Sequence, residues 1–225
     1  MTFSIVARCE RTGQVGVGAM TAMPAVGKLL THAFPGVGAV ATQALVNPYL
    51  GIDGIEHLRA GLSAEDAIAS LRDADPEIER RQIAAVDRKG RTAAFTGSKC
   101  LKWAGHRCRV GYSVQGNRLE GEHVLDAMER VFMAHVGQPL ADRFVEALAA
   151  ADAVGGDKKE ERSATVYIFD EEEYPLWDIR VDEHDDPVAE LRRVHEVFRR
   201  DLIPHILKMA KRPGRANPKG AEQPS

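Results

Sequence analysis

The sequence predicts an α+β protein in which two stacked antiparallel sheets are flanked by helices. Three observations support this fold class. Neighbouring strands are joined by short hairpin turns, helices arrive in pairs, and neither an internal repeat nor a linker interrupts the pattern. Hairpins produce antiparallel sheets, and amphipathic helices cover sheet faces. Two helical layers over two stacked sheets would bury all of the apolar faces.

The first half of the chain supplies five expected strands and two helices. Alternating strand formers and turn residues mark the first hairpin, which turns at residues 11–14. Ser63 is expected to cap the second helix, because Glu65 and Asp66 in its first turn suit the helix dipole. The expected strands are Phe3–Arg8, Val15–Met20, Val37–Ala44, Gln82–Val86 and Thr92–Thr96, and the first helix spans Gly51–Ala60.

The second half begins with a loop rich in glycine and basic residues. It leads to an expected strand at Cys108–Gln115, two amphipathic helices around Phe132 and Phe144, and strands at Ala164–Phe169 and Leu176–Val181. A long helix starts at Asp186 and should kink at Pro204. We therefore expect a single domain over residues 1–210. Residues 211–225 are basic with no apolar side chain larger than alanine, which predicts a disordered tail.

Composition limits the classes of partner and location. The 225-residue chain has a formal charge of -3, which gives no electrostatic basis for nucleic acid or an anionic membrane as partner. The three cysteines have no paired spacing, so no disulfide framework is expected. The N-terminus lacks a basic stretch followed by an apolar run, so no signal peptide is expected. We expect a cytoplasmic protein whose partner is a small molecule. The apolar stripe of the last long helix suggests a homodimer.

Thr2 is the first candidate for chemistry. A threonine at a free N-terminus can act as a nucleophile while its own α-amine, with a pKa of about 7.7–8.0, takes the hydroxyl proton. Its small side chain permits removal of Met1. If Met1 is retained, the nitrogen of Thr2 is an amide and cannot be the base. The alternative is that Thr2 is only the first residue of a strand.

Asn117 and Gly116 end a strand and form a second candidate. The Asn117 amide and a backbone N–H could stabilise a developing oxyanion, whereas a turn is the alternative interpretation.

Two further segments could bind substrate. The glycine-rich segment Gly155, Gly156 and Asp157, together with Ser163, could hold the polar end of a substrate, although a helix stop explains the glycines equally simply. Thr42, Gln43 and Asn47 at the end of an apolar strand could line a polar pocket or bond to the nearby backbone.

No metal or cofactor site is expected. Cys100, His106 and Cys108 lack the fourth ligand and the spacing that a zinc site needs. Gly36 and Gly38 are too few for a dinucleotide fingerprint, and no helix follows them directly.

Short blocks along the chain, taken in order, carry a family resemblance. The opening MTFSIVAR (residues 1–8) resembles that of domain of unknown function family 1028. The further blocks are AVG (25–27), GVGAVATQA (36–44), NP with Gly51 (47–51), TG (96–97), WAGH (103–106), VQGN (114–117), GGD with SA (155–157, 163–164) and RVD with DP (180–182, 186–187).

The resemblance implies an α/β/β/α sandwich of the N-terminal nucleophile (Ntn) hydrolase-like class, and it makes Thr2 the leading nucleophile. It supplies no substrate. This chain departs from the family pattern at Cys9, which replaces an aspartate, and at Thr21, which replaces a serine. The loop at residues 159–162 also lacks the glycine and glutamine that the family often has.

Two main functions follow from these observations. The first is an Ntn-type hydrolase in which Thr2 attacks a small amide- or peptide-like substrate once Met1 is removed. The second is a non-catalytic Ntn-like domain that binds a small ligand or a protein partner, which the altered loop favours. A third possibility is a hydrolase that uses Ser4, Thr21 or Ser163 as nucleophile without N-terminal processing, but no histidine or carboxylate can be assigned as its base from the sequence.

Overall fold

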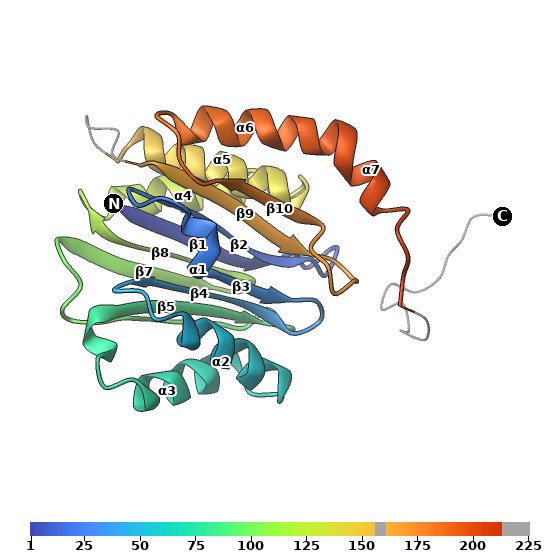
Figure 1. The fold of residues 1–225 in the computed structure, drawn as a ribbon. Helices are drawn as coiled ribbons and strands as arrows, with labels where there is room; N and C mark the ends of the chain where they lie inside the picture. Colours follow the sequence, from blue (N-terminus) through green and yellow to red (C-terminus); the bar gives the residue numbers. More distant parts are fainter. Residues whose placement is uncertain (156–160, 213–225) are drawn as a thin grey trace.

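The computed structural model describes residues 1–155 and 161–212 and contains helices and two antiparallel sheets (Figure 1). One sheet has six strands in the order β10-β9-β2-β1-β8-β7, and the other has four in the order β3-β4-β5-β6. The strands are β1 Thr2–Arg8, β2 Val15–Thr21, β3 Thr31–Phe34, β4 Gly38–Ala44, β5 Arg81–Asp87, β6 Thr92–Thr96, β7 Trp103–Arg109, β8 Tyr112–Leu119, β9 Ser163–Phe169 and β10 Trp177–Val181.

The helices begin where the sequence places capping residues. Asn47, Ser63 and Asp186 accept the first free backbone N–H groups of α2, α3 and α6, and a proline follows two of these caps. The helices are α1 Val26–Leu29, α2 Pro48–Arg59, α3 Ala64–Ala74, α4 His123–Ala134, α5 Leu140–Ala153, α6 Pro187–Val197 and α7 Ile203–Ile206.

Three apolar clusters hold these elements together. The α4, α5 and α6 helices pack on one face of the six-stranded sheet around Phe3, Phe132 and Phe144. The α2 and α3 helices pack on the outer face of the four-stranded sheet. The inner faces of the two sheets meet around Val6, Val17 and other small residues, so the sheets lie between the two groups of helices (Figure 1).

The structure differs from the sequence-based expectation in two hairpins. A strand, β3, precedes β4, and β7 replaces most of the expected loop before β8. The expected strand Cys108–Gln115 was wrong in its bounds, because a turn at residues 110–111 ends β7 and β8 continues to Leu119. Both β3 and β7 are edge strands of their sheets. The β7 side chains are half-buried or exposed on both faces, so the segment lacks the apolar alternation that marks a strand.

The last helix is interrupted near Pro204, as expected. A π-helical turn, Phe198–Leu202, separates α6 from α7. Proline cannot donate a hydrogen bond to the carbonyl four residues before it, so the regular pattern breaks one turn earlier. Beyond α7, the Arg212 guanidinium lies 2.5 Å from the Glu173 carboxylate in the β9–β10 turn. The remainder of the expected tail, residues 213–225, lies outside the described residues.

Candidate functional site

Thr2 lies in a row of polar side chains that crosses the six-stranded sheet. In the strand register Thr2 is opposite Thr21 on one side and Asn117 on the other, and Thr21 is opposite Ser163. Paired residues of neighbouring strands point to the same face. Val6 of the same strand packs between the sheets, and residues two or four apart share a face, so this row faces the four-stranded sheet.

The Thr2 hydroxyl is bonded to a second hydroxyl. Its Oγ1 lies 2.7 Å from Oγ1 of Thr21, which also donates to the carbonyl oxygen of Met1 at 3.2 Å. The backbone N–H of Ala22 donates to the same carbonyl at 3.2 Å. Two donors therefore converge on the acyl oxygen directly before Thr2.

Met1 is enclosed at this end of the sheet. Its ammonium lies 3.3 Å from Oε1 of Glu161, and the Met1 side chain is only 7% exposed. Glu161 is buried, and its Oε1 makes no hydrogen bond within residues 1–155 and 161–212, so the Met1 ammonium is the charge that compensates it. A Cβ atom at Gly155 would lie 2.3 Å from Met1 Cε, which explains why glycine suits that position.

A network of buried amides lies beside Thr2, between the two sheets. Gln82 of β5 is at its centre: Oε1 accepts from Gln43 at 2.7 Å and from Asn117 at 3.0 Å. Its Nε2 lies 2.8 to 3.0 Å from Thr96 Oγ1 and from the carbonyl oxygens of Gly105 and Gly116. The side chain of Gln82 thus joins four strands of two sheets.

Ser4 extends this network along β1. Its hydroxyl donates to Gln43 at 2.6 Å and accepts from Gln115 at 2.7 Å, and Ser113 donates to Gln115 at 2.9 Å. Each of these four side chains is fully buried. At the sheet edge the Thr96 hydroxyl lies 2.8 Å from Nδ1 of His106, so a continuous series of hydrogen bonds connects the interior with an exposed imidazole.

The structure therefore brings Thr2, Gln43, Gly116 and Asn117 to one end of the space between the sheets. The Asn117 amide nitrogen donates to Gln82, and the Gly116 carbonyl accepts from it. A Cβ at Gly116 would lie 2.6 Å from a Leu119 methyl group. In this arrangement both residues support the network.

Ser163 lies in the same row as Thr2, but its side chain bonds to the loop before α1. Its hydroxyl donates to the Met23 carbonyl at 2.6 Å and accepts from the Val26 N–H at 3.0 Å. Gly155 packs against Met1. Gly156 and Asp157 lie outside the described residues.

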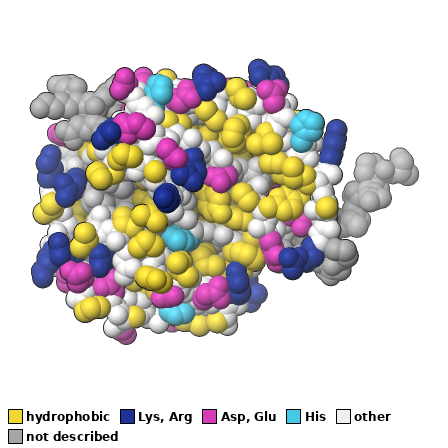
Figure 2. Space-filling view, viewed as in Figure 1, with side chains coloured by type: hydrophobic (Ala, Val, Ile, Leu, Met, Phe, Trp, Pro, Cys, Tyr) yellow, Lys and Arg dark blue, Asp and Glu magenta, His cyan; other side chains and the backbone are white. Residues whose placement is uncertain are grey.

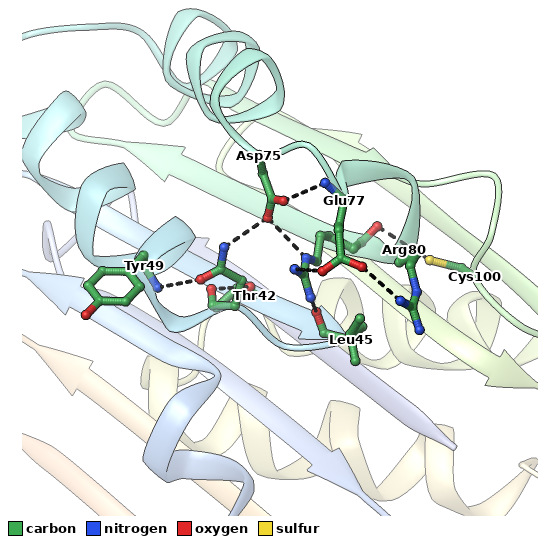
Figure 3. A network of polar contacts seen from close by, with 9 residues as sticks. Thr42, Leu45, Tyr49, Asp75, Glu77, Arg80 and Cys100 are labelled. Carbon is green, nitrogen blue, oxygen red and sulfur yellow. Dashed lines mark hydrogen bonds and ion pairs between the residues drawn. The ribbon is translucent and has the colours of Figure 1, made fainter.

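Thr42 and Asn47 belong to a different network, on the helical side of the four-stranded sheet (Figure 3). Thr42 donates to the Asn47 carbonyl at 3.2 Å, and Asn47 donates to Asp75 at 2.9 Å. Arg81 binds the same Asp75 oxygen at 3.1 Å and also the Leu45 carbonyl at 2.6 Å. This network connects the end of β4 to the end of α3, so both residues have structural partners here.

The carboxyl group of Asp75 is stabilised in its charged form. Burial alone would raise the pKa of Asp75, but hydrogen bonds from Asn47, the Glu77 backbone and Arg81 outweigh burial and lower this pKa below its ordinary value. The loop therefore depends on an ionised aspartate.

Backbone strain is concentrated at the same end of the sheets. Four non-glycine residues have a left-handed backbone with φ of 53° to 69°: Ala25, Ala44, Lys102 and Arg118. Ala44 directly follows Gln43, and Arg118 directly follows Asn117. Such conformations cost of order 1–3 kcal/mol each and gather at functional sites. The strain agrees with the polar network in marking this end as the candidate site.

The opposite end of the sheets has a groove of about 950 Å³, lined by hairpin turns and by residues such as Arg8, Phe34 and Arg88. Exposed apolar residues lie at both ends: Met23 and Tyr49 near the Thr2 end are 68% and 69% exposed, and Val110 in the β7–β8 turn is 93% exposed. Figure 2 shows hydrophobic side chains gathered over α1 on this face.

Neither a metal centre nor a membrane span is found in the described part of the chain. No group of three or more His, Cys, Asp or Glu side chains within it is placed to hold a metal ion. No helix there is both long and apolar enough to cross a bilayer.

Sequence reasoning missed Gln82 and the contact of Glu161 with Met1. It offered Ser4 only as an alternative nucleophile, although the two-residue alternation of β1 places Ser4 on the same face as Thr2. Gln82 meets Asn117 only through the packing of two sheets. No local pattern connects Glu161 with a residue 160 positions earlier.

Comparison with known proteins identifies the family. The family model described as "Family of unknown function (DUF1028)" matches residues 2–191, and the chain belongs to this family. The crystal structure of protein SPO2555 from Silicibacter pomeroyi, from the same family, is 31% identical with a TM-score of 0.84 and covers 90% of this chain and 88% of its own.

A second solved structure is far more distant. Anbu (ancestral beta-subunit) from Yersinia bercovieri is 11% identical with a TM-score of 0.45, covering 93% of this chain and 98% of its own. A likeness this weak bears on neither fold nor function. No curated protein matches the chain.

Proposed function

We propose that this protein is an Ntn-type hydrolase in which Thr2, exposed by removal of Met1, attacks a small amide- or peptide-like substrate. The proposal includes the finer fold assignment: a four-layer α/β/β/α sandwich of the Ntn-hydrolase-like class, as the sequence resemblance implies. The observation that carries the proposal is the contact of the Thr2 hydroxyl with Thr21, beside a carbonyl that accepts from Thr21 and from the Ala22 N–H.

The chemistry needs only groups at this end of the sheet. In the processed protein the Thr2 α-amine accepts the hydroxyl proton, and Thr2 Oγ1 forms a bond to the acyl carbon. The Ala22 N–H and the Thr21 hydroxyl then act as oxyanion donors. The amine passes the proton to the leaving nitrogen as the amide bond breaks, and water hydrolyses the resulting ester.

Intact mass and kinetics test this proposal together. We expect the native protein to lack Met1 and to hydrolyse members of a panel of amino-acyl p-nitroanilides. Thr2→Ala, which still permits loss of Met1, should reduce kcat/KM by about 1,000-fold or more, whereas Thr2→Ser should retain turnover. Thr12→Ala, at the far turn of the same hairpin, is the matched control and should keep full activity. Complete retention of Met1 in the native protein would exclude the mechanism.

The alternative is a non-catalytic domain that binds a small ligand or a protein partner. The observation that favours it is the Met1 ammonium itself, which lies 3.3 Å from the buried carboxylate of Glu161. This function requires Met1 to be retained, and it requires Thr2→Ala to leave ligand-dependent thermal stabilisation unchanged.

A cytoplasmic location and a homodimer complete the proposal. Cys9, Cys100 and Cys108 are free thiols, as is typical of proteins in a reducing compartment. The exposed apolar side chains near the Thr2 end offer an interface between copies. Cell fractionation and native mass at several protein concentrations test the two statements.

A further inference from the structure

The space filled by Met1 has every contact that an amino-acyl group needs. The ammonium is paired with a buried carboxylate, Glu161, at 3.3 Å. The carbonyl oxygen accepts from Thr21 and from the Ala22 N–H, each at 3.2 Å. The thioether side chain packs against the cluster around Phe3 and ends beside Gly155.

Removal of Met1 changes this space in a defined way. Glu161 loses the ammonium at 3.3 Å, and its Oε1 has no hydrogen bond elsewhere in the described chain. The new α-amine, on Thr2, lies one residue further along the chain and is the base of the proposed reaction, so it does not replace the lost ion pair. A buried, uncompensated carboxylate is strongly unfavourable, so the processed site should favour a new cation there. The carbonyl donors and the apolar wall remain beside Thr2.

Resting on the proposed function, we infer that this space is the acyl subsite of the enzyme. It would take the amino-terminal residue of a peptide or amino-acid amide that has a free α-ammonium and an unbranched apolar side chain. Glu161 would bind the ammonium, and Gly155 would leave room for the end of the side chain. Met1 in the unprocessed chain occupies the subsite as a substrate residue would.

The position of the acyl carbon agrees with attack by Thr2. In Met1 the carbonyl carbon is covalently bonded to the Thr2 nitrogen. In a free substrate the corresponding carbon is not bonded to Thr2, so it must lie further from this nitrogen, at van der Waals distance. The same two donors can follow this small movement, because both lie at the strand end that holds Thr2. Hydrolysis would then consume one water and release an amino acid and an amine.

The experiment compares two substrates on protein shown by intact mass to lack Met1. L-Methionine p-nitroanilide should be hydrolysed with a kcat/KM about 100-fold above that of its N-acetyl derivative, because acetylation removes the charge that Glu161 binds. Glu161→Gln should equalise the two substrates. Glu183→Gln removes an exposed carboxylate that pairs with Arg162, and it should leave the ratio unchanged.

Side-chain selectivity provides an independent measurement. A methyl group at Gly155 would enter the space of Met1 Cε, so Gly155→Ala should shift preference from the methionine to the alanine p-nitroanilide by about 10-fold or more. Equal hydrolysis of free and N-acetylated substrates by the native protein would overturn the subsite and leave the proposed function intact.

Binding of L-methionine tests the subsite independently of hydrolysis. L-Methionine should stabilise Met1-free Thr2→Ala thermally, but it should not stabilise native-sequence protein made with methionine aminopeptidase inhibited, in which Met1 fills the space. Binding that Glu161→Gln abolishes, without turnover of any amide by the native protein, would support the subsite and overturn the hydrolase. Absence of both binding and turnover would overturn both.

Discussion

The two ends of the space between the sheets are built by the same strands but from opposite chemistry. At the hairpin-turn end the inward side chains are apolar and small, such as Val6, Ala41 and Val86. Toward the Thr2 end, inward positions of the same strands are Ser4, Gln43 and Gln82. All six side chains are fully buried. Burial therefore does not decide the chemistry of these positions.

The difference shows what each end contributes. Apolar burial at one end stabilises the sheet pair without fixing a unique geometry in detail. A fully satisfied amide network has only a few acceptable arrangements, and it is costly when any partner is missing. The polar end therefore gives up some hydrophobic stabilisation to fix the positions of Thr2 and its neighbours.

The largest expected effect is that of Gln82→Leu. It leaves Gln43, Asn117 and Thr96 without their shared partner, and each buried unsatisfied group costs about 1–3 kcal/mol, so we expect a loss of about 4 kcal/mol or more in the free energy of unfolding. Val86→Ala, on the same strand at the apolar end, should lose about 2 kcal/mol. Urea denaturation measures both, and equal losses would show that the two ends do not differ as described.

The charged network outside the sheets gives the next largest effect. Asp75→Asn removes the negative partner of Arg81, and we expect a loss of about 2–3 kcal/mol at pH 7. Because folding lowers the pKa of Asp75, its contribution is complete above the unfolded value of about 3.9 and disappears as pH falls through the folded value. The difference between native protein and variant should therefore shrink below about pH 4.

Denaturation at pH 7 and pH 3 tests this dependence, and Glu65→Gln, at an exposed position of α3, is the control. The amides between the sheets carry no charge, so the loss caused by Gln82→Leu should be the same at both pH values. A pH-dependent loss in that variant would mean that His106, which lies at the exposed end of the series of hydrogen bonds, is coupled to Gln82.

The sequence predicted the strands that alternation or flanking turn residues mark. Alternation identified β1, and the turn residues beside them identified β2 and β5. The edge strand β7 lacks apolar alternation, so its residues were assigned to a loop. The sequence resemblance pointed to the same fold class as the alternation, and the family assignment implied by its short blocks is confirmed.

The candidate site was predictable only in part. Thr2, Gln43 and Asn117 do gather at one end of the sheets, as residues at strand ends can. Thr42 could not line the same pocket as Gln43, because neighbouring strand residues point to opposite faces. The bond between Asn117 and Gln82 joins strands of different sheets, and it depends on how the sheets pack, which no spacing within the sequence encodes.

The smallest expected effects come from two variants of β1, one that removes a hydroxyl group at the polar end and one that adds a hydroxyl group at the apolar end. Ser4→Ala leaves Gln43 Oε1 without a donor and Gln115 Nε2 without an acceptor, and should cost about 2 kcal/mol of unfolding free energy. Val6→Thr keeps the shape of valine but buries a hydroxyl among apolar side chains, and should cost about 1–2 kcal/mol. Both variants can be measured by urea denaturation under the same conditions.

The two results are informative together, because removing a hydroxyl and adding one should each destabilise the same strand. If adding a hydroxyl at Val6 cost nothing, a polar partner would have to be within reach at the apolar end. The two ends would then differ only in how many polar side chains they contain. If removing the hydroxyl at Ser4 cost nothing, the amides would have to rearrange freely, and the network could not hold Thr2 in a fixed position.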